Sequence, residues 1–73
     1  MWNYRVVKTD FNGDYSRLAI HEAFYDDNGK LITITEDPVT VNADLEEGVE
    51  GLKEILEHMM LALAKPVINK SDL

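Results

Sequence analysis

The chain has 73 residues, a net charge of −7 and no cysteine. A chain of this length folds as one small domain, and without cysteine it has neither disulfide bonds nor thiolate-bound metal to hold it together. The surplus of carboxylates argues against a nucleic-acid partner, which needs clustered Lys and Arg, and the apolar content of 45% argues against intrinsic disorder.

A hairpin is predicted at the start of the chain. Residues 2–9 and 15–25 alternate in polarity as strands do, and an Asn-Gly pair between them marks a turn. A three-residue loop at 12–14 places Val6 opposite Ile20, whereas a two-residue loop would place the charged Arg5 opposite Ile20. Because a one-residue slip moves a whole strand to the other face, the three-residue loop is favoured.

A third strand is predicted at residues 31–35, after a turn at 27–29. A three-residue loop at this turn places Phe24 opposite Ile32. A proline follows the strand, and the sequence leaves open whether residues 39–41 form a short extra edge strand. The face expected to be covered by the helix carries Trp2, Tyr4, Val6, Leu18, Ile20, Phe24, Ile32 and Ile34.

Residues 44–65 form the segment whose length and periodicity predict an α-helix. An Asp-x-x-Glu capping box at 44–47 begins it, and Pro66 ends it. Gly48 and Gly51 weaken the helix, and the sequence leaves open whether they allow close approach to the sheet. The stripe predicted to form the core has helical spacing and consists of Leu45, Val49, Leu52, Leu56, Met59 and Leu63.

These elements predict an α+β fold, a three-stranded antiparallel meander with one C-terminal α-helix packed on one face, in a single domain spanning residues 1–73. The reverse face of the sheet is more apolar than a solvated face needs, and Leu61 projects from the polar side of the helix. We therefore expect a protein partner or a second copy of the chain to bind there. The candidate interface residues are Arg5, Val7, Ala19, His21, Ala23, Tyr25, Leu31 and Leu61.

Glu22 is the residue that most suggests chemistry, because it lies on the predicted core face opposite Tyr4, and carboxylates in apolar surroundings are sometimes general acids. A small enzyme or ligand-binding protein using Glu22, Tyr4 and His21 is therefore an alternative. A glutamate at the margin of the core explains the same pattern. Glu54 and His58 lie one helical turn apart, but two ligands make a weak zinc site. We predict no catalytic residues, no cofactor and no metal.

Several short motifs carry a resemblance. WNYRVV at residues 2–7, IHExxYD at 20–26, NGK at 28–30 and KPV at 65–67 together resemble a group of short, uncharacterised bacterial proteins, which implies a bacterial origin and no known activity. More loosely, a hairpin and third strand followed by ADLEE at 43–47 opening an amphipathic helix resemble the HicB-type antitoxin domain. That resemblance implies a toxin-binding, oligomeric protein with a partial RNase H-like fold.

The function we predict is that of a small, acidic, cytoplasmic protein that is not an enzyme and acts through protein–protein interaction or homodimerisation. The alternatives are a HicB-like antitoxin or regulator and the ligand-binding protein or enzyme described above. We expect no nucleic-acid partner, because the chain is acidic. We expect no membrane partner and a cytoplasmic location, because no apolar run approaches 18 residues and no secretion signal is present.

Overall fold

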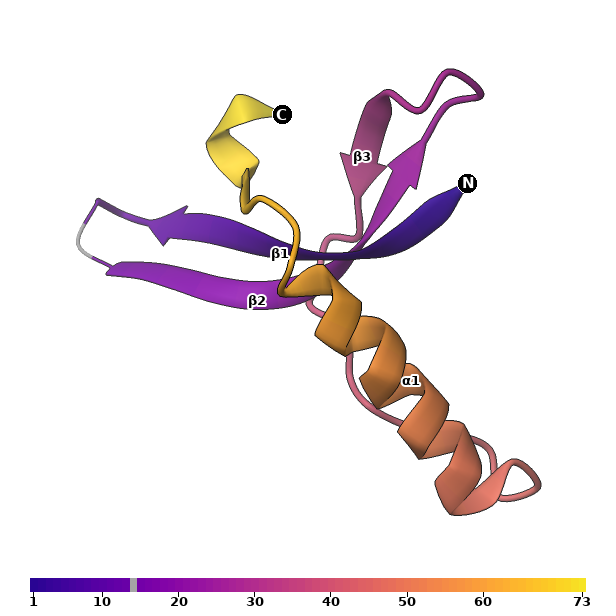
Figure 1. The fold of residues 1–73 in the computed structure, drawn as a ribbon. Coiled ribbons are helices and arrows are strands. Elements are labelled where there is room, and N and C mark those ends of the chain that lie inside the picture. Colours follow the sequence, from indigo (N-terminus) through magenta and orange to yellow (C-terminus); the bar gives the residue numbers. More distant parts are fainter. Residues whose placement is uncertain (14) are drawn as a thin grey trace.

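The computed structural model describes residues 1–13 and 15–73; Asp14, the last residue of the predicted first loop, lies outside the described residues. The elements are β1 (Trp2–Phe11), β2 (Tyr15–Tyr25), β3 (Leu31–Ile34), α1 (Gly48–Ala62), β4 (Ile68–Asn69) and the 3-10 helix η1 (Lys70–Asp72). The strand order is β3-β2-β1-β4, with β4 parallel to β1 and the other pairs antiparallel (Figure 1). The predicted α+β fold is confirmed, with a mixed four-stranded sheet.

The first hairpin has the predicted register. Val6 lies opposite Ile20, in a ladder of pairs that runs from Trp2 and Phe24 to the residues on either side of the turn. Gly13 in the turn has a φ of 80°, a left-handed conformation that costs glycine little. Hydrophobic matching between the two long strands was therefore enough to predict how they pair.

The second hairpin keeps its predicted turn but not its predicted register. The Asp26 carboxylate accepts hydrogen bonds from two backbone N–H groups of the turn, each at 2.9 Å, as aspartate does in Asx turns. A β-bulge beside Phe24 then places this side chain opposite Thr33. The prediction that Phe24 faces Ile32 is wrong, because a bulge adds one unpaired residue to a strand and shifts every later pair.

The fourth strand forms at a place that the sequence did not suggest. Residues 39–41 are not a strand; Val39 N–H donates one hydrogen bond of 2.9 Å to the Ile20 carbonyl. The extra strand is instead Ile68–Asn69, which pairs in parallel with the middle of β1. Parallel neighbours need a long crossover connection, and α1 lies within it.

α1 is shorter than predicted at both ends. The Asp44 N–H donates to Glu47 Oε1 at 3.3 Å, so half of the predicted capping box forms. Gly48 has a φ of 65°, which separates this turn from the helix proper. At the other end, the helix stops at Ala62. A Cβ at Gly51 would lie 2.7 Å from the Glu47 Cβ, so this glycine allows close approach to the preceding turn rather than to the sheet.

α1 touches the sheet with its C-terminal end and projects away from it over most of its length (Figure 1). Its buried side chains are Met59 and Ala62. Farther out, Val49 is 79% exposed, and Leu45 in the preceding turn is 96% exposed. The prediction that the whole stripe forms the core is wrong, because a helix of 15 residues is about 22 Å long and extends well past the strand it crosses.

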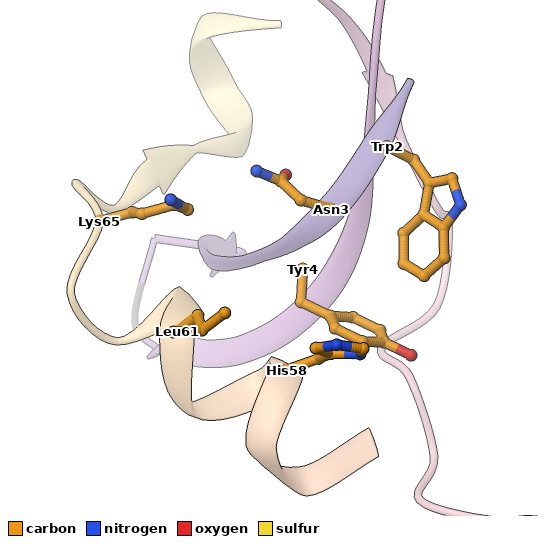
Figure 2. Close-up of a pocket in the computed structure, with 6 residues that line it drawn as sticks. All are labelled: Trp2, Asn3, Tyr4, His58, Leu61 and Lys65. Carbon is orange, nitrogen blue, oxygen red and sulfur yellow. The ribbon is translucent and has the colours of Figure 1, made fainter. Parts of the chain in front are cut away.

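The sheet face turned toward α1 is correspondingly only part-covered. Ile20 lines a hollow with α1 side chains, as predicted, and Tyr4 lies beside the helix in Figure 2. Trp2 and Leu18 remain exposed, against the prediction that one helix covers this whole face. The register shift in the second hairpin places Ile34 opposite Ala23, on the reverse face, so the prediction that Ile34 faces the helix is wrong.

The reverse face of the sheet is buried at its centre. Val7, His21 and Ala23 are almost completely buried, so the expectation of an open reverse face is wrong at these three positions. The C-terminal segment, for which no element was predicted, contacts β1 through η1. Figure 1 shows η1 and α1 leaving β1 in opposite directions.

Candidate interaction surface

The predicted interface residues of the sheet do lie together. The strand pairing places seven of them on neighbouring positions of β1, β2 and β3: Arg5, Val7, Ala19, His21, Ala23, Tyr25 and Leu31. Their centre is buried within the protomer, as described above, and Ala19 and Leu31 are half-buried. Leu61, the eighth residue, lies apart from them on α1 and is 62% exposed.

A chain of hydrogen bonds ties the polar members of this group to the rest of the fold. Arg5 donates from Nη1 to the Tyr25 hydroxyl at 2.9 Å and from Nη2 to the Pro66 carbonyl at 2.6 Å. The Tyr25 hydroxyl in turn donates to Asn3 Oδ1 at 2.9 Å. Arg5 therefore connects β1, β2 and the segment after α1, and its guanidinium already has partners within the chain.

The three residues of the alternative ligand-binding or catalytic site do not converge. Tyr4 and Glu22 lie opposite each other in the β1–β2 ladder, but His21 is the neighbour of Glu22 on β2 and so faces the other side of the sheet. His21 Nδ1–H donates to the Thr35 carbonyl at 2.9 Å, which fixes that nitrogen as the protonated one. Its Nε2 is buried with no hydrogen-bond partner among the described residues.

A pocket lies between the start of β1 and the C-terminal half of α1 (Figure 2). Its lining residues are Trp2, Asn3, Tyr4, His58, Leu61 and Lys65. The Trp2 and Tyr4 rings meet edge to face with centroids 5.2 Å apart, and Figure 2 shows the His58 ring beside that of Tyr4. The pocket offers aromatic faces with one imidazole and one ammonium group at its rim.

A second hollow lies on the opposite side of α1, at the end that contacts the sheet. Its lining residues are all apolar: Ile20, Leu56, Met59, Met60 and Leu63. Farther along the same side of the helix lies the exposed part of the apolar stripe, where Leu56 is 50% exposed and Val49 more so. Apolar side chains in water along a helix, next to an apolar hollow, form a surface suited to burying another chain.

The spacing of the apolar stripe in the sequence also indicated a surface that binds another chain. The stripe positions follow each other at intervals of four and three residues. This spacing suits a helix that packs on its own sheet, but it is equally the a and d spacing of a helix that packs on another helix. The structure favours packing on another helix, because most of the stripe lies beyond the part of α1 that contacts the sheet.

Comparison with known proteins found no matching family model, no matching curated protein and no matching solved structure. In residues 1–13 and 15–73, no helix is long and apolar enough to cross a membrane. The same residues contain no group of three or more His, Cys, Asp or Glu side chains placed to hold a metal ion. The function must therefore be inferred from the chain's own surface.

Proposed function

We propose that this protein is not an enzyme and acts by binding another protein chain through the apolar side of α1. We call this region the α1 surface; its residues are Ile20, Leu45, Val49, Leu52, Leu56, Met59, Met60 and Leu63. It replaces the reverse face of the sheet as the candidate interface, because the reverse face is buried at its centre.

The observation that carries the proposal is the size of the solvent-exposed surface. The chain exposes 5604 Å², whereas a compact monomer of 8.3 kDa exposes about 4,600 Å². The difference of about 1,000 Å² is close to the roughly 800 Å² that each partner buries in a protein–protein interface of standard size. A protomer with this much surplus surface is one that completes its packing against a partner.

The stability of α1 supports the same proposal. A helix of 15 residues is marginal in water by itself, and most helical stability in proteins comes from packing of the apolar face. Here Met59 and Ala62 pack on the protomer, and the roughly three turns of helix before them project from the sheet, with Val49 and Leu56 exposed and Leu52 half-buried. A bound chain would supply the packing that this part of the helix lacks.

The proposal can be tested with a photo-crosslinking amino acid introduced at single positions in cells that naturally make the protein. Benzoylphenylalanine at Val49 or Leu56 should form adducts with a protein, because both positions lie on the α1 surface. The same group at Glu54, which is exposed on the polar side of the helix, should form none. No adduct at Val49 and Leu56, or equal adducts at all three positions, would contradict the proposal.

The HicB-type resemblance supplies a second candidate, an antitoxin or regulator whose partner is a toxin. Charge supports it, since a net charge of −7 complements a small basic protein and would speed their association. The test is to identify a small basic protein encoded beside this chain and to purify the two together. If no such neighbour exists, or if it does not bind, this candidate is refuted while binding by the α1 surface stands.

A further inference from the structure

We propose that the chain bound at the α1 surface is a second copy of this protein, with the two α1 helices antiparallel and related by a two-fold axis. This inference rests on the proposed function and identifies its partner. Each copy has an apolar tip, Leu45 and Val49, and an apolar base pocket formed by Ile20, Leu56, Met59, Met60 and Leu63. In the dimer, the tip of each copy fills the base pocket of the other.

One part of the surface protrudes and the other is hollow. The tip protrudes at the free end of the helix, while the base pocket is a hollow at the end that contacts the sheet. A two-fold interface requires one patch that matches itself in reverse order. The α1 surface meets this requirement when the axis passes between Leu52 and Leu56, because Leu52 of one copy then lies against Leu56 of the other and the two tips reach the two pockets.

The charges on α1 favour the antiparallel arrangement over the parallel one. Four exposed carboxylates surround the tip: Asp44, Glu46, Glu47 and Glu50. In a parallel pair the two groups would lie side by side and repel each other. In an antiparallel pair they lie at opposite ends of the helices, about 22 Å apart, well beyond the screening length of about 8 Å at physiological salt.

The antiparallel arrangement also leaves room for both sheets. Each sheet contacts the C-terminal end of its own helix, so the two sheets of the dimer lie at opposite ends of the helix pair. The surplus surface of the whole chain is of the size that a stable dimer needs, since each copy exposes about 1,000 Å² beyond the expectation for its mass and a standard interface removes roughly 800 Å² from each.

Sedimentation equilibrium on the purified full chain tests the identity of the partner. The wild-type protein should sediment with twice the chain mass of 8.3 kDa at micromolar concentration. Leu56→Asp should weaken the dimer by about 100-fold or more, as loss of a buried interface anchor does. Leu61→Asp is the matched control, a similarly exposed leucine on the other side of the helix, and should change the dissociation constant by less than about threefold.

A wild-type protein that is monomeric at about 100 μM, where even weak specific dimers form, would overturn the second-copy proposal. An equal loss of dimer in the two variants would also overturn it. The proposed function fails separately, in the photo-crosslinking experiment: a monomer that still forms adducts with a different protein at Val49 keeps the proposed function and excludes self-association.

Cysteine crosslinking tests the direction of the helices, because the natural chain has no cysteine and an introduced cysteine is the one reactive thiol. With the axis between Leu52 and Leu56, two copies of residue 52 lie close together, whereas two copies of residue 49 lie about 15 Å apart along the helix axis. A short bismaleimide should therefore join Leu52→Cys chains at least about tenfold faster than Val49→Cys chains. Equal rates indicate parallel helices, and no crosslinking of either variant places the interface elsewhere; both results overturn the proposal.

Discussion

Met59→Ala is the substitution that should most directly separate α1 from the sheet. Met59 is 6% exposed and is, with Ala62, the part of α1 buried within the protomer. Shortening a buried methionine to alanine costs about 2–5 kcal/mol of unfolding free energy. We expect about 2–3 kcal/mol here, toward the lower end of that range, because Met59 also lines the open base pocket, so that neighbours and water can fill part of the space.

The measurement is thermal unfolding followed by circular dichroism at one protein concentration. For a domain of this size, a loss of 2–3 kcal/mol corresponds to a fall in Tm of about 10–20 °C. Since a single small core rarely supplies more than about 3–5 kcal/mol, the variant should retain little folded structure at 37 °C. The control is Leu61→Ala, where an exposed leucine is removed from the same helix and the change should be about 0.5 kcal/mol or less. If both variants lose the same stability, α1 is not held to the sheet by Met59.

Three further predictions follow from other parts of the structure. The wild-type Tm should rise by about 5 °C for each tenfold increase in concentration if unfolding and dissociation are one step, and a constant Tm would exclude that coupling. Gly51→Ala should destabilise the protein by about 1–3 kcal/mol in urea titrations, because the new Cβ would lie 2.7 Å from a side-chain carbon of the preceding turn; a gain in stability would show that this turn moves freely. The Ser16 hydroxyl, and secondly Lys8, hold the pKa of Asp10 below its usual 3.8, so the contribution of Asp10 to stability is present above that value and is lost as pH falls through the lowered pKa. Ser16→Ala should raise the Asp10 pKa in an NMR titration, and an unchanged value would contradict the hydrogen bond.

The register of the first hairpin was predictable because it depends on local sequence. Two long alternating strands joined by an Asn-Gly turn leave few pairings, and a one-residue slip would set Arg5 opposite Ile20 in place of Val6. The bulge in the second hairpin was not predictable in this way. One extra residue beside Phe24 is compatible with the same alternation of side chains, and its position depends on how β3 packs.

The C-terminal strand and the buried reverse face were missed for a different reason. A two-residue strand such as β4 has no detectable period. The hydrogen bond that helps to hold the segment before it, from Arg5 to the Pro66 carbonyl, joins residues 61 positions apart. Such contacts are properties of the folded chain, so Val7 and Ala23 were predicted to be available to a partner, whereas the protomer buries them.

The apolar stripe of α1 shows what a sequence pattern predicts and what it does not. Its apolar stripe was predicted correctly as a stripe and wrongly as the core of one protomer, since spacing reports which side chains share a face and not which molecule covers that face. The length of the helix indicates which molecule covers the stripe. A helix that served its own sheet alone would need apolar side chains near Met59 and Ala62, yet the stripe continues outward through Leu56 and Leu52 to Val49. Val49 and Leu56 weaken the isolated protomer by exposing apolar surface, so they are best explained by a second chain that buries them.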